Sequence, residues 1–65
     1  MLIRILVETS FGNKFLESRT VSRCPIVGEH LEIQSTNSKY EVSEIRTIYK
    51  GPQEIIDVYL KRIIN

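Results

Sequence analysis

Apolar and polar residues alternate with a period of two along most of this chain. The alternation is clearest over residues 1–9, where Ile3, Ile5 and Val7 share one face. A period of two is typical of a β-strand with one buried face, whereas an amphipathic helix repeats every 3.6 residues. Segments with strand-like patterns cover residues 1–9, 14–23, 30–34, 40–49 and 53–64.

Four loop signals separate these segments, at residues 10–13, 24–29, 35–38 and 51–52. They are rich in Gly, Pro, Asn and Ser, which either tolerate positive φ angles or fix φ near the value that a turn needs. Short segments with turn signals at this spacing predict a meander of β-hairpins.

The fourth segment changes phase within its length. Tyr40 and Val42 share one face, but Ile45 and Tyr49 continue that face only if one position is skipped. A phase change in a period-two pattern is typical of a β-bulge, which we predict at residues 43–44. Small barrels need such bends in order to close.

The last segment, residues 53–64, fits two structures. As a strand it places Ile56, Val58 and Leu60 on one face, and as a helix it would start at Pro52 with an apolar side at helical spacing. Its many Ile and Val residues favour the strand, because β-branched side chains fit a pleated sheet better than a helix.

Composition supports a chain made mostly of strands. The sequence contains ten Ile, five Val and four Thr but no Ala or Trp. With 65 residues, one domain over residues 1–65 is expected. We therefore predict an all-β fold, a single small five-stranded antiparallel barrel, and keep four strands plus a C-terminal helix as the alternative. The predicted core is Ile3, Ile5, Val7, Leu31, Ile33, Tyr40, Val42, Ile45, Val58 and Leu60.

One stretch of the chain resembles a known group of folds. Residues 25–33 read Pro-Ile-Val-Gly-Glu-His-Leu-Glu-Ile, followed by Tyr-Glu-Val-Ser-Glu-Ile at 40–45 and Asp-Val-Tyr-Leu at 57–60. This pattern resembles the small SH3-like β-barrels of bacteria, phages and mobile elements, and it covers about residues 25–60. The resemblance implies an SH3-like barrel and brings no catalytic or ligand-binding residue with it.

Charge and cysteine content narrow the functional classes. Nine Lys and Arg stand against eight Asp and Glu, so the net charge of +1 lacks the basic excess of a dedicated nucleic-acid binder. The sequence has no apolar run that could span a membrane and no signal-peptide pattern at its start. Cys24 cannot form an internal disulfide, so we expect a protein of the reducing cytoplasm.

Candidate chemistry is sparse. His30 and Glu32 share a strand face near Glu29, but a zinc site needs three or four ligands, and Cys24 would have to reach it from the loop. Cys24 with His30 as base lacks a recognisable third group or oxyanion site. A solvated strand face and a small buried apolar cysteine explain these residues better. We therefore expect no catalytic residue, no metal site and no cofactor, and a protein that is not an enzyme.

Both terminal segments carry apolar residues on both of their faces. A barrel of this size buries only one face, so the other needs a second copy, a foreign protein or a covering loop. The expected interface is Leu2, Leu6, Ile55, Tyr59 and Ile63. This pattern favours a protein-interaction module, either a homodimer or a phage or mobile-element factor that binds or inhibits a host protein.

Nucleic-acid binding is the alternative, because aromatic residues beside cations form platforms on which bases stack. The expected contacts are Arg46, Tyr49, Lys50 and Lys61. Acidic residues on the same strands explain these cations equally well as partners in cross-strand ion pairs. A small ligand held at a dimer interface is a third hypothesis.

Overall fold

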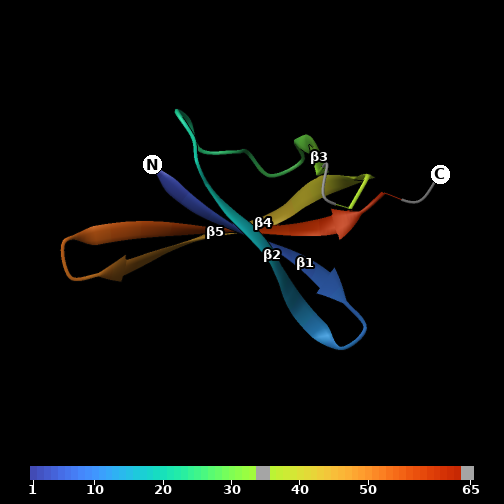
Figure 1. Ribbon diagram of the computed structural model, residues 1–65, viewed down its shortest axis with the longest axis horizontal. Coiled ribbons are helices and arrows are strands. Elements are labelled where there is room, and N and C mark those ends of the chain that lie inside the picture. Colours follow the sequence, from blue (N-terminus) through green and yellow to red (C-terminus); the bar gives the residue numbers. More distant parts are fainter. Residues whose placement is uncertain (34–35, 64–65) are drawn as a thin grey trace.

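Five β-strands make up the computed structural model, which describes residues 1–33 and 36–63. They are β1 (Leu2–Thr9), β2 (Gly12–Thr20), β3 (His30–Ile33), β4 (Ser38–Lys50) and β5 (Gln53–Arg62). All five belong to one sheet in the order β2-β1-β5-β4-β3, which twists and curls into a half-barrel (Figure 1). The prediction of an all-β chain with five strands is confirmed. None of the described residues form a helix with the length and hydropathy that a membrane crossing requires.

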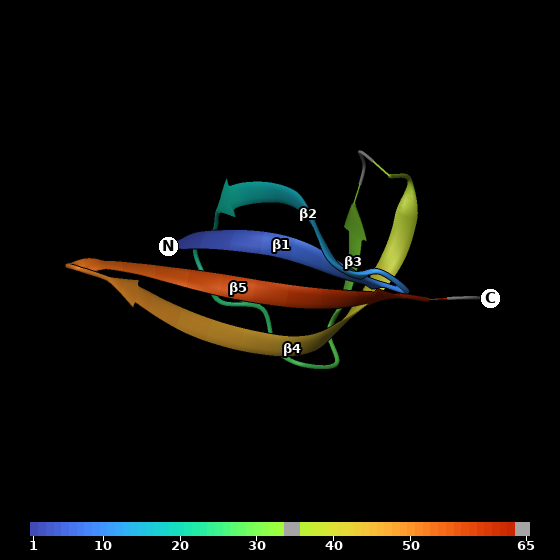
Figure 2. The same ribbon diagram turned by 90° about the horizontal axis from the view of Figure 1, so that it is seen from below.

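The first and last strands of the chain, β1 and β5, lie side by side in the middle of the sheet and run parallel. Leu2 lies beside Ile55 and Val7 beside Leu60. The prediction of a purely antiparallel barrel is therefore wrong. Short turns force neighbouring segments to pair antiparallel, but β1 and β5 are far apart in the sequence and no turn fixes their relative direction. Because β2 and β3 end the sheet without pairing with each other, the half-barrel has two edges (Figure 2).

Residues 53–62 form a strand, as the β-branched side chains favoured, and Ile64 at the end of the predicted segment lies outside the described residues. β5 is hydrogen-bonded to β1 on one side and to β4 on the other. The predicted bulge is confirmed, since the β4–β5 register shifts between Val42 and Glu44. The bulged Ser43 donates its hydroxyl to the Tyr59 carbonyl at 3.0 Å, which holds the bend to β5.

A tight turn joins β1 to β2. The Thr9 hydroxyl donates to the Gly12 carbonyl at 2.7 Å and accepts the Phe11 amide at 3.2 Å. Gly12 has φ of +110°, a conformation that a side chain would disfavour. The turn therefore presents Phe11 to solvent, with 98% of its surface exposed.

The core lies on the concave face of the sheet. Eight predicted core residues are buried there, namely Ile3, Ile5, Val7, Ile33, Tyr40, Val42, Val58 and Leu60. Leu31 and Ile45 are only half-buried and pack against this core from its margin. Ile56 belongs to the core although it was not in the predicted set, because it lies between β1 and β4 on the same face as Val58.

The segment between β2 and β3 covers one end of the core. The Gly28 amide donates to the Val42 carbonyl, and the Val42 amide donates to the Glu29 carbonyl, both at 2.9 Å. Within this segment, Pro25 is buried. β2 ends at Thr20 rather than near residue 23, because the chain leaves the sheet there to cross the concave face. Gln34 and Ser35, placed in a strand and a loop by the sequence, lie outside the described residues.

Candidate binding surfaces

The convex face of the sheet, opposite the core, also carries apolar side chains. Figure 2 looks onto this outer face: β2, β1, β5 and β4 lie side by side, and the segment that joins β2 to β3 passes behind them. Strand register places apolar residues there in two cross-strand rows. We call them together the outer patch: Leu2, Ile55 and Ile48 in one row, and Phe15, Leu6 and Tyr59 in the other.

Four of the five residues predicted as an interface lie in the outer patch. The parallel β1–β5 pairing sets Leu2 against Ile55 and Leu6 against Tyr59. Ile63 is not brought to them, because it follows β5 beyond the end of its pairing with β1, and its amide donates to the Lys39 carbonyl at 3.0 Å.

Phe15 and Ile48 belong to the outer patch although neither was predicted there. The β1–β2 register shifts between Ile5 and Leu6, so that Phe15 lies opposite Leu6 while Glu17 lies opposite Ile5. Simple alternation would place Phe15 and Glu17 on the same face of β2. The bulge between them turns Phe15 to the outer face instead. Exposure within the patch is uneven, from 53% for Phe15 to 9% for Ile55.

An ion pair separates the two rows of the outer patch. Arg4 holds Asp57 with two hydrogen bonds, Nε to Oδ1 at 2.7 Å and Nη2 to Oδ2 at 2.8 Å. Among the described residues, Asp57 is the one charged residue that is buried, with 3% of its surface exposed. The hydrogen bond to Asp57, and then the charge of that carboxylate, raise the pKa of the Arg4 guanidinium above its ordinary value. The Arg4 guanidinium therefore stays a charged donor, and charged donors make the strongest bidentate contacts with a carboxylate.

Arg46 extends the ion pair into a charged band across three strands, which consists of Arg4, Asp57 and Arg46. It lies opposite Asp57 in the β4–β5 register, and its guanidinium carbon is 5.3 Å from the centre of the Tyr59 ring. It also pairs with Glu44 at 3.2 Å. The sequence did not indicate the Arg4–Asp57 pair, because the two residues are 53 positions apart and only the parallel register sets them side by side.

The residues proposed for nucleic-acid binding are not brought together. Arg46 and Lys50 alternate onto the outer face, while Tyr49 lies on the opposite face at the tip of the β4–β5 hairpin. Lys61 is at the other end of β5, where it pairs with Glu41 at 3.6 Å. The four predicted residues therefore do not form a single platform, and the aromatic ring beside Arg46 is that of Tyr59 rather than the predicted Tyr49.

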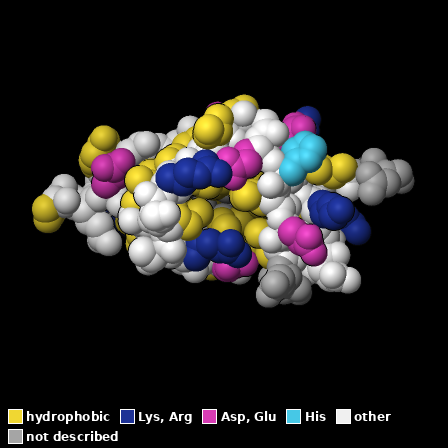
Figure 3. All heavy atoms as spheres, turned by 90° about the horizontal axis from the view of Figure 1, so that it is seen from above, with side chains coloured by type: hydrophobic (Ala, Val, Ile, Leu, Met, Phe, Trp, Pro, Cys, Tyr) yellow, Lys and Arg dark blue, Asp and Glu magenta, His cyan; other side chains and the backbone are white. Residues whose placement is uncertain are grey.

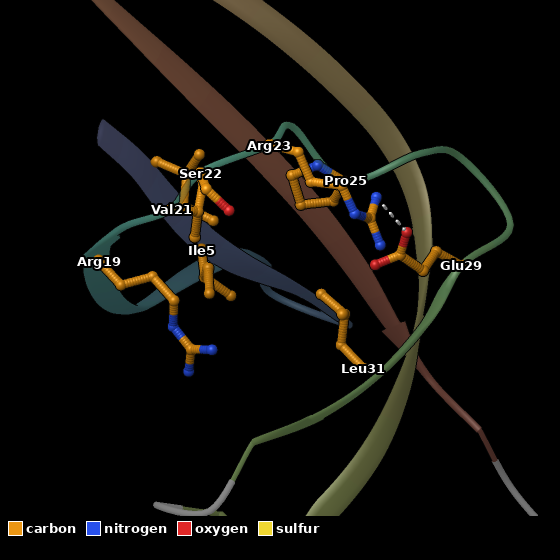
Figure 4. Close-up of a pocket in the computed structure, with 9 residues that line it drawn as sticks. Ile5, Arg19, Val21, Ser22, Arg23, Pro25, Glu29 and Leu31 are labelled. Atoms are coloured by element: carbon orange, nitrogen blue, oxygen red, sulfur yellow. Dashed lines mark ion pairs between the residues drawn. The ribbon is translucent and has the colours of Figure 1, made fainter. Parts of the chain in front are cut away.

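A cleft opens on the concave face between the edge strands β2 and β3, which do not pair with each other. It has a volume of about 200 Å³, and its floor is made by Ile3, Ile5, Val21 and Leu31. Figure 3 shows this side of the molecule, with hydrophobic side chains visible in a hollow between basic side chains that each have an acidic neighbour. Arg23 pairs with Glu29 at 3.0 Å on one side of the cleft, and Arg19, which pairs with Glu17 at 2.9 Å, lies across from them (Figure 4).

The polar residues singled out for chemistry are scattered. The Nε2 atom of His30 lies 3.5 Å from Oε1 of Glu41. Cys24, in the segment between β2 and β3, is half-buried against the core. Among residues 1–33 and 36–63, no three His, Cys, Asp or Glu residues are grouped so that they could hold a metal ion.

No protein-family model matches this chain, and no curated protein or solved structure matches it either. A functional assignment therefore rests on the surfaces of this chain alone.

Proposed function

We propose that this chain is a non-enzymatic protein-interaction module whose outer face binds a partner protein. The observation that carries the proposal is the outer patch. A single-layer sheet needs only one apolar face to form its core, and here that face is the concave one. Apolar side chains on the second face are then available to a surface outside the domain.

The charged band indicates what kind of protein surface fits. Asp57 lies beneath the guanidinium of Arg4. The side chain of Arg4 is 36% exposed, and that of Arg46 is 62% exposed. At Arg4 the group nearest to a partner is therefore cationic, because the compensating carboxylate of Asp57 is buried in the sheet. The charge of Arg46 is offset by Glu44, whose side chain is 49% exposed on the same face. The partner that complements the outer face is an apolar protein surface with an acidic side chain near its centre. Tyr and Arg are also the residue types that dominate binding energy in protein interfaces.

The fold relationship, the cellular location and the kind of partner belong to the same proposal. The Pro25–Ile33 pattern supports a relationship to SH3-like barrels, here with an open seam and a parallel central pair. A lone half-buried cysteine suits a reducing cytoplasm. The same resemblance carries the proposal of a phage or mobile-element factor directed at a host protein.

Site-specific crosslinking tests whether the outer face is the binding surface. A photoreactive phenylalanine analogue replaces Phe15, which is 53% exposed on the outer face, or Tyr49, which is 73% exposed on the opposite face. We expect one protein to be crosslinked in cells from position 15 and not from position 49. Equal crosslinking from both positions, or crosslinking to nucleic acid, would contradict the proposal.

Tyr59→Lys is expected to weaken binding of the partner so identified by about tenfold or more, because it places a cation in a desolvated aromatic position beside Arg46. Titration of the purified pair by calorimetry measures the loss. Tyr49→Lys introduces the same charge on the opposite face and is expected to leave the affinity unchanged. Binding to an apolar surface changes little with salt, whereas phosphate contacts weaken steeply, so a steep salt dependence would favour the nucleic-acid alternative instead.

A further inference from the structure

β2 is a long edge strand that nothing in the described chain covers on its open side. It pairs with β1 on one side and ends the sheet on the other. Most of its residues are exposed, and it contains no proline. Unpaired edges of this kind are templates for another strand. The opposite edge, β3, is only four residues long and is a poorer template.

The hydrogen bonds of the β1–β2 ladder show which backbone groups of β2 are free. The Val21 amide donates to the Met1 carbonyl at 2.9 Å, and the Met1 amino group donates to the Val21 carbonyl at 2.9 Å. In an antiparallel ladder such hydrogen-bonded pairs alternate with pairs that are not bonded. Arg19 is therefore also bonded to β1, whereas the amide and carbonyl of Ser18 and of Thr20 point to the open edge.

The sequence around Ser18 is complementary to itself when a second copy runs antiparallel. A two-fold axis at Ser18 sets Glu17 of each copy opposite Arg19 of the other. The Ser18 amide of each copy then meets the Ser18 carbonyl of the other. Glu17 and Arg19 would form a non-hydrogen-bonded pair, in which side chains approach most closely. Moving the axis to Glu17 or to Arg19 would instead oppose like charges. Moving it to Thr20 would set Ser18 opposite Ser22, which lies beyond the end of β2, so Ser18 is the axis that keeps the pairing within the strand.

We propose that β2 pairs with β2 of a second copy of this chain, antiparallel about a two-fold axis at Ser18. The pairing joins the two half-barrels into one continuous sheet. Glu17 and Arg19 already form an ion pair within one chain at 2.9 Å, and the dimer extends it into a four-charge cluster. The small hydroxymethyl side chain of Ser18 leaves the axis free of steric conflict.

This dimer uses the backbone edge of β2 rather than the outer face of the sheet. Phe15 of the outer patch also lies on β2, so the two proposals are separated by their variants: Ser18→Pro blocks the edge, and Tyr59→Lys changes only the outer face. The β2 bulge at Leu16 keeps the regular ladder short, and such a contact is small. We therefore expect a weak dimer that forms only at high chain concentration rather than at nanomolar concentration.

Charge exchange tests the register directly. Sedimentation equilibrium is measured for wild type, for Glu17→Arg, for Arg19→Glu and for an equal mixture of the two variants. We expect wild type to dimerise, each variant alone to self-associate at least about tenfold more weakly because like charges oppose each other, and the mixture to recover the affinity. Dimers of undiminished affinity in either variant alone, or no recovery in the mixture, would overturn the proposal.

A backbone test separates edge pairing from contact elsewhere. Ser18→Pro removes an amide that points away from β1, so the β1–β2 ladder is kept while the edge is blocked. We expect this variant to melt cooperatively as a monomer, and Ser18→Ala, which keeps the amide, to dimerise like wild type. In wild type, the Ser18 and Thr20 amides should exchange more slowly as the chain is concentrated. A wild-type chain that stays monomeric at millimolar concentration, or a dimer lost in Tyr59→Lys but kept in Ser18→Pro, would refute edge pairing.

Discussion

Replacing Leu60 with alanine is expected to remove most of the stability of this fold. Leu60 lies on the central strand β5 and is fully buried at 0% exposure. Truncating a buried leucine costs about 2–5 kcal/mol, because both the transfer free energy and the packing around the cavity are lost. A chain of this length has a free energy of unfolding of roughly 3–10 kcal/mol. Urea denaturation followed by circular dichroism should therefore show Leu60→Ala partly or wholly unfolded without denaturant.

Two matched substitutions locate the effect in the core. Leu31→Ala makes the same truncation at a half-buried site on the edge strand β3, and a smaller loss is expected. Phe11→Ala removes a larger side chain that is 98% exposed, and its effect should stay within about 0.5 kcal/mol. Equal losses at Leu60 and Leu31 would show that β5 is not the centre of the core.

Arg4→Met is expected to be the most damaging change of a charged residue. It leaves the Asp57 carboxylate, which is 3% exposed, without the guanidinium that holds it at 2.7 Å and 2.8 Å. Removing one partner of a buried pair is strongly destabilising because a charge remains in a poorly solvated site. We expect the melting temperature to fall by about 10–20 °C, measured by scanning calorimetry at neutral pH.

The control for this prediction is the exposed ion pair of β2. Arg19→Met breaks a contact with Glu17 at a site where both side chains reach solvent, and it should change the melting temperature by less than about 4 °C. Adding Asp57→Leu to Arg4→Met should restore much of the lost stability, since no uncompensated charge remains. If the double variant melts no higher than Arg4→Met, the damage comes from lost packing of the Arg4 side chain rather than from the stranded charge.

Local patterns predicted the strands and the bulge because both are properties of short stretches of backbone. Alternation along β1 assigned Ile3 and Ile5 to the core, and the phase change in the fourth segment predicted the bulge at residues 43–44, where the structure has it. Simple alternation would group Phe15 with Glu17, whereas the β2 bulge places Phe15 opposite Leu6. No second apolar run in β2 marks this change of phase in the sequence.

The candidate surfaces were only partly predictable for a related reason. Apolar residues on both faces of the terminal segments identified Leu2, Leu6, Ile55 and Tyr59 as a set. The structure places them as two cross-strand pairs on one face, with an ion pair between them. Ile63 was assigned to the same set by its period, but period does not tell where the neighbouring strand ends. The cleft between β2 and β3 depends on two strands that do not pair, and no local pattern reports a missing pairing.

The sequence by itself determined that this chain is built of strands, which face of each strand is apolar, and that its two ends carry apolar residues on both faces. Only the tertiary structure decided that β1 and β5 run parallel, that Arg4 meets Asp57, and that the barrel stays open. The division has a physical reason. Side-chain alternation follows from the pleat of a single strand, whereas the direction and register of strands distant in sequence are set by how the whole chain buries its apolar faces at once.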